Sequence, residues 1–397
     1  MYLSNIYDYL KWRGDLLMTV DPFNDIDALI LSELVYVEFL DTVPSFLSNQ
    51  SRSLQDVAKD FFLKNDESVL MNRFSFIKES INLLKVLSTC QRFKNIKLSN
   101  YVNELNYNDA KQFAAITYQL EDDSIFVAYR GTDDTILGWK EDFLMTYKYP
   151  VQSQIQAASY LKSIIEHFYQ SKISLIINEH KFSNIFKRRL KKPIIRIGGH
   201  SKGGNLAVFA ASTIDDKDAQ KIIQIYNYDG PGFPEKMIQH TNYKMIVDKI
   251  KKFIPENSVF GIMLENLETV KIIKSNAKGL MQHNGFTWQI IGKDFDTVDK
   301  LSKESMALSD AFKSWLEKVD LKTRESAIKA IFTILESANI KTVDDFTEKS
   351  FSHLVTALKE FKNLQNDTRD AIIHFFKTLL VESNNYYRKY YRDNDNS

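Results

Sequence analysis

Hydrophobic positions follow different periods in successive parts of the chain, so it divides into a helical beginning, an alternating middle and a helical end. Apolar residues lie three and four positions apart in three early segments, 25–39, 53–62 and 74–87. This spacing predicts that residues 1–106 are mainly helical. Asn24 or Asp25 is a suitable N-cap for the first of these helices. No Gly- or Pro-rich linker follows them, so we predict no separate N-terminal domain.

The middle of the chain alternates short β-branched runs with helical patterns. Residues 113–120 and 124–129 predict two strands joined by an acidic turn. Further strands are predicted at 194–197, 221–228, 249–254 and 270–273, and the main helices between them at 152–168 and 205–212. Because strands alternate with helices between residues 110 and 290, we expect an α/β fold with a mostly parallel sheet covered by helices on both faces.

From residue 297 the pattern is charged, amphipathic and free of Gly and Pro. It predicts helices at 297–319, 322–338, 342–361 and 368–381. We therefore divide the chain into a domain of residues 1–296, which includes the N-terminal helices, and a helical region of residues 297–397. An amphipathic stripe shows only that these helices pack against something, so the region could be a lid, a cap or an oligomerisation element.

One short stretch between a predicted strand and a predicted helix carries the clearest chemical pattern. It is Gly199-His200-Ser201-Lys202-Gly203, which matches G-x-S-x-G with a strand before it and a helix after it. A strand that turns at once into a helix holds its middle residue at strained backbone angles and lifts that side chain clear of the sheet. The small glycines on either side let strand and helix approach closely. The pattern predicts a nucleophile elbow with Ser201 at its apex.

A serine hydroxyl needs a base beside it, and four histidines follow Ser201 in the chain. His353 and His374 fall within the C-terminal helical pattern, where a structural role is the better interpretation, and His240 lies in a polar connection. His283 follows a predicted strand in a loop between Gly279 and Gly285. We expect His283 to be the base.

The base in turn needs a carboxylate, and two acidic residues end predicted strands. Asp229 ends the strand after the elbow helix, and the following Gly-Pro-Gly fixes a sharp turn around it. Glu256 ends the next strand and is the alternative acid. We prefer Asp229, although a turn-forming role for its side chain is the competing interpretation.

Two donors are needed for the oxyanion of an attacked carbonyl group. One is expected from the backbone N–H of Lys202, and the other from the loop Gly131-Thr132 after an early strand, where the Thr132 hydroxyl could contribute. The acidic residues after this loop are expected to brace it, and Arg130 is expected to pair with one of them: Asp133, Asp134 and Asp142.

Composition narrows the class of protein. The chain has 397 residues, a formal net charge of +1 and one cysteine, Cys90, so we expect neither nucleic-acid binding nor an internal disulfide. The absence of a signal peptide and of a long apolar run predicts a cytoplasmic protein. No metal or cofactor motif is present, so none is expected. The basic segment between Lys181 and Lys192 is either a solvated surface or a peripheral contact with anionic lipid.

The motifs V-A-Y-R-G-T-D-D, G-G-H-S-K-G-G-N-L-A and Y-D-G-P-G-F resemble those of the α/β-hydrolase superfamily. The chain looks similar to the fungal-type (class three) lipases and closest to a poorly characterised bacterial branch of hydrolases. The resemblance covers roughly residues 1–290. Those lipases place the acid after the later strand, where this chain has Glu256, whereas pancreatic-type lipases place it one strand earlier in a setting that Asp229-Gly-Pro resembles.

The resemblance implies a serine esterase or lipase that forms an acyl-enzyme, with Ser201, His283 and Asp229 as its triad. The substrate would be a small-molecule or lipid ester, and Lys202, where many lipases have Leu or Met, could favour an anionic ester. The alternative is a catalytically silent hydrolase fold used as an interaction module. The sequence also leaves a homo-oligomer open.

Overall fold

The computed structural model describes residues 4–72, 77–106, 111–133, 136–145, 147–180, 194–306, 309 and 320–337. Within these residues one large sheet has the strand order β1-β2-β3-β4-β5-β6-β7-β8-β11, and β9 and β10 form a separate pair. The strands are β1 (Arg52–Ser53), β2 (Lys97–Asn106), β3 (Lys111–Gln119), β4 (Ile125–Tyr129), β5 (Ile195–His200), β6 (Ile222–Tyr228), β7 (Ile250–Pro255), β8 (Val270–Ile273), β9 (Ile290–Ile291), β10 (Asp294–Phe295) and β11 (Thr297–Val298).

The large sheet is mixed rather than mostly parallel, so that part of the sequence prediction was wrong. Strands β4 to β8 are parallel to one another, whereas β1–β2, β2–β3, β3–β4 and β8–β11 pair in antiparallel fashion. The reason lies in the connections. A short acidic turn joins β3 to β4, and only an antiparallel pair can be joined by so few residues. The five central strands keep the parallel order that brings their carboxyl ends to one edge.

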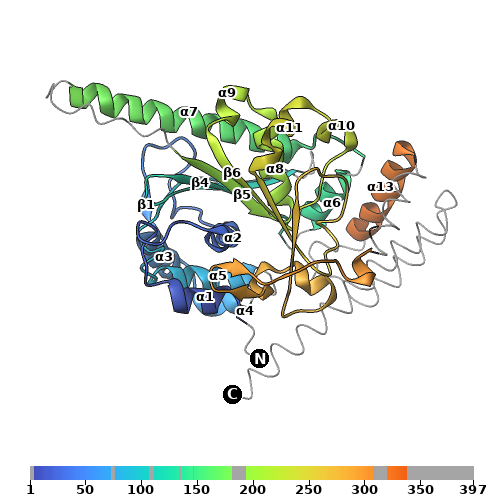
Figure 1. Cartoon of the computed structure of the whole chain (residues 1–397), viewed down its shortest axis with the longest axis horizontal. Coiled ribbons are helices and arrows are strands. Elements are labelled where there is room, and N and C mark those ends of the chain that lie inside the picture. Colours follow the sequence, from blue (N-terminus) through green and yellow to red (C-terminus); the bar gives the residue numbers. More distant parts are fainter. Residues whose placement is uncertain are drawn as a thin grey trace, which may run out of the picture.

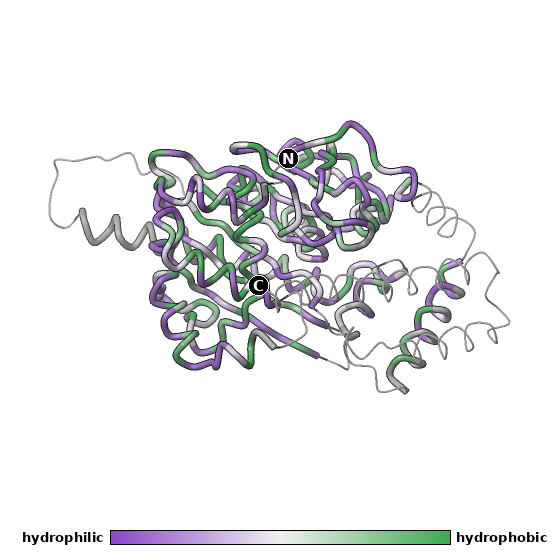
Figure 2. The backbone as a smooth tube through the Cα atoms, turned by 90° about the horizontal axis from the view of Figure 1, so that it is seen from below, coloured by the Kyte–Doolittle hydropathy of each residue, from purple (hydrophilic) through white to green (hydrophobic). Residues whose placement is uncertain are grey.

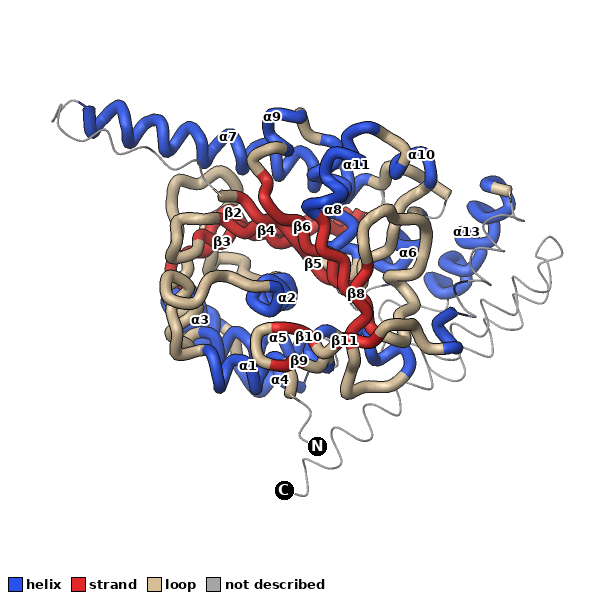
Figure 3. The backbone as a smooth tube through the Cα atoms, viewed as in Figure 1, coloured by secondary structure: helices blue, strands red, loops and turns tan. Residues whose placement is uncertain are grey.

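Helices cover both faces of this sheet (Figures 1 and 3). The longer ones α7 and α8 pack on one face with α11, and α2 lies against the other with α1, α3 and α5 beyond it. The helices are α1 (Ile6–Arg13), α2 (Asp25–Leu34), α3 (Leu54–Lys64), α4 (Glu67–Asn72), α5 (Ile77–Leu87), α6 (Ile136–Leu144), α7 (Gln152–His180), α8 (Lys202–Thr213), α9 (Asp216–Ala219), α10 (Glu235–Ile238), α11 (Thr241–Ile246) and α13 (Leu321–Ser337).

Strand β2 is the main element that the sequence did not predict, because residues 1–106 were interpreted as mainly helical. It is ten residues long and pairs with β3, but the register shifts between Ser99 and Val102. Asn100 sits in this irregularity at φ 56°, the left-handed region that asparagine tolerates better than most residues. The bulge breaks the alternation of apolar and polar residues on which a strand prediction depends.

Helix α2 is the most deeply buried of the N-terminal elements. Asn24 is its N-cap, as one of the two predicted alternatives, and forms a capping box with Asp27. Every residue from Ile26 to Leu34 is buried, because the helix lies between the sheet and the outer N-terminal helices. It ends at Leu34, five residues before the predicted end at Phe39.

The C-terminal prediction is partly correct. Helix α13 corresponds to the predicted helix 322–338, but Thr297–Val298 is strand β11 and pairs with β8 rather than starting a helix. The predicted helices 342–361 and 368–381, and the basic segment Lys181–Lys192, lie outside the described residues. Helix α13 packs on α6, where the rings of Phe143 and Phe332 are 5.9 Å apart.

Hydrophobic and hydrophilic residues alternate along the tube in Figure 2 rather than gathering in one long apolar segment. Among the described helices, none combines the length and the apolar character that a membrane span requires.

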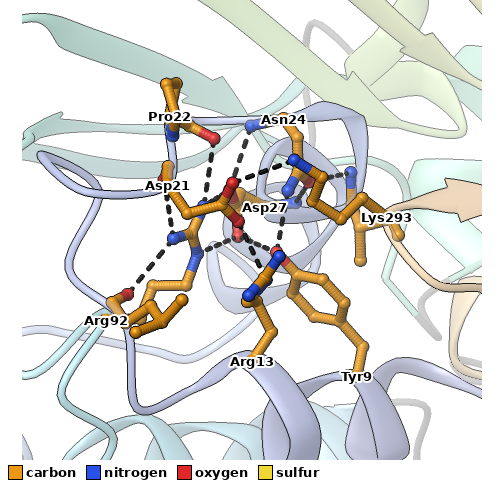
Figure 4. A network of polar contacts seen from close by, with 10 residues as sticks. Tyr9, Arg13, Asp21, Pro22, Asn24, Asp27, Arg92 and Lys293 are labelled. Carbon is orange, nitrogen blue, oxygen red and sulfur yellow. Dashed lines mark hydrogen bonds and ion pairs between the residues drawn. The ribbon is translucent and has the colours of Figure 1, made fainter.

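A buried ion pair joins α2 to the segment before β2 (Figure 4). Arg92 donates from Nε and Nη2 to the two carboxylate oxygens of Asp27, at 2.8 and 2.5 Å, and both side chains are fully buried. The same guanidinium donates to the carbonyl oxygens of Leu16, Asp21 and Pro22. All five N–H donors of arginine can therefore be used, which is how a buried guanidinium is accommodated.

A second carboxylate extends this network to the β9–β10 hairpin. Asp21 lies 2.9 Å from Arg13 of α1 and 2.9 Å from Lys293 in the hairpin turn. These contacts and the nearby positive charges lower the pKa of Asp21, although burial opposes them. The network connects α1, the segment before β2 and the β9–β10 hairpin around α2, the helix that packs against β5.

Because Arg92 and Asp27 are fully buried, removing one partner leaves an uncompensated charge. We expect Arg92→Met to lower the free energy of unfolding by about 3–5 kcal/mol, measured by urea denaturation. The double variant Asp27→Leu/Arg92→Met should lose much less. As a matched control, Lys162→Met removes a half-exposed ion pair with Asp215 and should cost no more than about 1 kcal/mol. An equal loss of unfolding free energy in Arg92→Met and Lys162→Met would contradict this expectation.

Candidate active site

Ser201 occupies the sharp turn between β5 and α8. Its backbone angles are φ 57° and ψ −133°, a sparsely populated conformation for a residue with a side chain. Two hydrogen bonds fix it: Ser201 N donates to the Tyr228 carbonyl at 2.8 Å, and Gly204 N donates to the Ser201 carbonyl at 2.9 Å. Such strain persists only where the surroundings hold it, and it places the serine at the N-terminus of α8.

The elbow is built on close backbone packing. A Cβ on Gly203 would lie 2.1 Å from the Tyr129 carbonyl oxygen, and a Cβ on Gly199 would lie 2.4 Å from the Gly203 carbonyl carbon. No real side chain tolerates such distances, so both glycines of the G-x-S-x-G pattern are needed for β4, β5 and α8 to meet here. Gly131 is equally close on the other side, because its Cβ would lie 2.5 Å from the His200 carbonyl oxygen.

Asp229 lies at the end of β6, beside the elbow. Its carboxylate is fully buried and accepts three hydrogen bonds: Oδ1 from Ser258 Oγ at 2.5 Å and from Gly261 N at 3.1 Å, and Oδ2 from His283 Nδ1 at 2.6 Å. Asp229 has φ 51°, and its own N–H donates to the Phe253 carbonyl at 2.7 Å. The orientation of the carboxylate is thus set from several sides.

The Gly-Pro-Gly turn after Asp229 is tied to the elbow helix. Asn205 Nδ2 of α8 donates to the carbonyl oxygens of Pro231 and Gly232, at 3.1 and 3.0 Å. Asn227 Oδ1 accepts from Gly230 N at 2.8 Å. These amide side chains fix the turn and the elbow relative to each other, which explains the asparagine in G-G-N-L-A.

His283 ends the 3₁₀ helix η2 (Gly279–His283) and lies between Asp229 and the elbow. Its ring centroid is 4.5 Å from that of His200 and 4.4 Å from that of Phe260. Because Asp229 accepts from Nδ1, the neutral ring carries its free lone pair on Nε2, the arrangement that a general base requires. Among the hydrogen bonds of the described residues, none joins Ser201 Oγ to the His283 ring. In enzymes without bound substrate such a hydrogen bond is often long, and it tightens when substrate binds.

His200, the residue before the serine, supports His283 from behind. His200 Nε2 lies 2.7 Å from the His283 carbonyl oxygen, so it must be a donor. Burial lowers the pKa of His200 well below its ordinary value, so the ring is neutral and its Nδ1 accepts from the Tyr36 hydroxyl at 3.3 Å. Glu33 Oε1 lies 3.6 Å from the same nitrogen, and burial raises the pKa of that carboxyl. Helix α2 and the residues after it thereby reach the site.

The predicted oxyanion loop lies against the elbow, but its threonine is already engaged. A Cβ on Gly131 would be 3.1 Å from Ser201 Cβ, so the loop backbone adjoins the serine. Thr132 Oγ1 donates its only proton to Asp142 Oδ2 at 2.6 Å, so a donor from this loop would be a backbone N–H. Asp142 therefore braces the loop as predicted. Arg130 lies 4.0 Å from Asp133, and Asp134 is outside the described residues.

The side chain of Lys202 does not face a substrate, so the expectation that it selects anionic esters was wrong. Lys202 is fully buried, and its Nζ donates to Glu141 Oε2 at 2.9 Å and to the Gln112 carbonyl at 3.2 Å. The physical reason is the elbow itself. Its sharp turn lifts the Ser201 side chain toward the site and directs the next one inward. The backbone of Lys202 still begins α8.

The remaining candidates lie elsewhere. Glu256 Oε1 is 3.5 Å from Gln282 Nε2, and none of its described contacts is with His283. His240 is the N-cap of α11 and accepts from Asn242 N. His353 and His374 lie outside the described residues. Of the two acids considered, only Asp229 contacts the candidate base.

Sequence analysis missed three residues that support the site: Ser258, His200 and Glu141. Ser258 had a usable signal, because it follows β7, the strand next to β6, and the carboxyl ends of adjacent parallel strands meet. Glu141 had none, since a single glutamate on a short helix gives no indication of burial. Across the described part of the chain, no group of His, Cys, Asp and Glu side chains is arranged to hold a metal ion.

Comparison with known proteins gives one assignment. The model of the Mbeg1-like family matches residues 87–333, more than half of the chain, so the chain belongs to the Mbeg1-like family. The matched segment contains Ser201, Asp229 and His283. No curated protein is significantly similar to this chain.

Two lipases are among the solved structures that the chain matches. The crystal structure of the M37 lipase has 16% sequence identity and a TM-score of 0.34, with 59% of this chain and 68% of that chain covered. The native propeptide complex of Rhizomucor miehei lipase has 13% identity and a TM-score of 0.33, with 66% and 79% covered.

The environment of Asp142 makes a prediction about stability. Burial raises the pKa of this carboxyl to about 6 against the lowering effects of Lys202 and Thr132. The folded protein therefore binds this proton more tightly than the unfolded chain between about pH 4 and pH 6. We expect the free energy of unfolding of the wild type, relative to Asp142→Asn, to fall as pH rises through that window and to stay constant above it.

Denaturant unfolding of both proteins at pH 4.5, 5.5, 6.5 and 7.5 measures this difference. A relative stability of the wild type that rises with pH would contradict the raised pKa.

Proposed function

We propose that this Mbeg1-like protein is a serine hydrolase that cleaves a carboxylic ester, with a lipid or other acyl ester as its substrate. The observation that carries the proposal is the 2.6 Å contact between Asp229 Oδ2 and His283 Nδ1 beside a serine held at φ 57° on a strand-to-helix turn. A carboxylate, an imidazole and a serine at the apex of such a turn are the groups that acyl transfer to a hydroxyl group requires.

The reaction follows from these atoms. Ser201 Oγ attacks the ester carbonyl carbon while its proton passes to His283 Nε2, and Asp229 stabilises the imidazolium through Nδ1. The new oxyanion is bound by the backbone N–H of Lys202 and a backbone N–H of the Gly131–Thr132 loop. His283 then protonates the departing alkoxide, which leaves an acyl group on Ser201. A water molecule then attacks the acyl carbonyl carbon while His283 takes its proton. His283 returns a proton to Ser201 Oγ as the carboxylic acid is released.

The surroundings of the triad favour this chemistry. Ser201 is 7% exposed and the His283 side chain 22% exposed, so much of the bulk water is excluded from both groups. The positive end of α8 points at Ser201 and favours developing negative charge. The ring of Phe260 against His283 supplies an apolar neighbour for an acyl chain.

The nucleophile assignment is tested with a fluorophosphonate probe, which forms an Oγ–P bond with loss of fluoride. We expect the wild type to be labelled and Ser201→Ala to lose all labelling, read by intact-protein mass. Ser212→Ala is the matched control, since it removes a buried serine of the adjoining helix α8 and should label normally. Labelling that persists in Ser201→Ala would refute the nucleophile, and a wild type that is never labelled would favour a catalytically silent module.

The acid assignment is tested by comparing Asp229→Asn with Glu256→Gln. An amide at position 229 would favour the wrong His283 tautomer, so we expect kcat for a nitrophenyl ester to fall by about 10³–10⁴-fold. Glu256→Gln should leave kcat close to the wild-type value. Similar losses for both variants, or a larger loss for Glu256→Gln, would overturn Asp229 as the acid.

A further inference from the structure

Lys202 follows the nucleophile directly, yet its ammonium group is fully buried. It is 2.9 Å from Glu141 Oε2, 3.2 Å from the Gln112 carbonyl oxygen and 3.5 Å from Gln112 Oε1. A buried cation is costly unless it is paired and hydrogen-bonded, and these oxygens satisfy it. The pair joins the first residue of α8 to α6.

Glu141 distributes this connection to two further elements. Its carboxylate is buried, and Oε2 also accepts from Gln112 N of β3 at 3.1 Å while Oε1 accepts from Ser153 N of α7 at 3.1 Å. The backbone of α6 is therefore held by charge to α8 and by hydrogen bonds to the sheet and to α7. Moving α6 away would leave two buried charges without partners.

The next residue of α6 connects to the other half of the oxyanion hole. Asp142 accepts from Thr132 Oγ1, and Gln112 Oε1 lies 3.4 Å from Asp133 N in the same loop. One short helix thus contacts both the residue after the nucleophile and the loop opposite it. On its outer side α6 is covered by α13 through Phe143 and Phe332.

We propose that Lys202 and Glu141 are positioning residues that hold α6 and the oxyanion loop in their working arrangement, so that the oxyanion hole is formed before substrate binds and hydrolysis needs no lipid–water interface. The inference rests on the proposed serine hydrolase function. Helix α6 is then fixed in place, and monomeric esters in solution are substrates.

The positioning role is tested by the rate of fluorophosphonate labelling, because the phosphonyl oxygen occupies the oxyanion hole during the reaction. Misplacing a donor by about 1 Å can cost on the order of 10²-fold in rate. We therefore expect Lys202→Met to slow labelling about 10–10²-fold, and to lower kcat for a nitrophenyl ester similarly with KM nearly unchanged. Lys162→Met, which removes a surface lysine, is the control and should behave as the wild type.

A second variant keeps the test decisive where Lys202→Met does not fold. Glu141→Gln retains the shape and one of the two acceptor oxygens but leaves Lys202 without a counter-charge, so the same slowing of labelling is expected. The double variant Lys202→Met/Glu141→Gln removes both charges but keeps an acceptor oxygen, and should regain thermal stability relative to the single variants without regaining rate. Folded single variants that label at the wild-type rate would overturn the positioning role.

The preformed hole is tested on the wild type with and without phosphatidylcholine vesicles. We expect the labelling rate constant of a short-chain, monomeric fluorophosphonate to be the same in both, within about twofold. An acceleration of tenfold or more by vesicles would overturn the inference while leaving the serine hydrolase function intact. Absence of labelling under both conditions would instead refute the proposed function, so the two failures are distinguishable.

Discussion

The strained backbone of Ser201 is the constraint on which the site depends. A residue with a side chain leaves this conformation unless its neighbours prevent it, and here the prevention is steric and polar at once. Gly199 and Gly203 permit β5 and α8 to meet, and Tyr228 binds the Ser201 N–H. The central sheet therefore holds Ser201 in its strained conformation, and the five parallel strands keep the site rigid.

Two buried ion pairs each join separate parts of the chain. Arg92 and Asp27 hold α2, which brings Tyr36 and Glu33 to His200. Lys202 and Glu141 hold α6. Buried ion pairs add little net stability, but they penalise any arrangement that separates the partners. In this protein the two ion pairs fix the positions of α2 and α6, and these helices in turn fix the geometry of the candidate site.

The sequence predicted the parts that depend on local pattern. Strand, elbow and helix around Ser201 were predicted because G-x-S-x-G and its flanking periods reflect backbone sterics within a dozen residues. Parallel strand order explains why Asp229 could be named from a position that ends a strand, whereas His283 was named from the loop that follows one. Strand β2 was missed because the bulge at Asn100 breaks its alternation, and the antiparallel flanks of the sheet follow from turn length rather than from periodicity. The fate of the Lys202 side chain depends on Glu141, some sixty positions earlier, and no local pattern contains that distance.

The most direct test of the central claim is to trap the acyl group itself. The protein is mixed with an excess of a nitrophenyl ester, quenched in acid within the first turnover and digested for peptide mass mapping. We expect the peptide containing Ser201 to gain the mass of the acyl group, with a matching burst of nitrophenol. An acyl group on a different residue, or turnover with no acylated peptide at all, would contradict it.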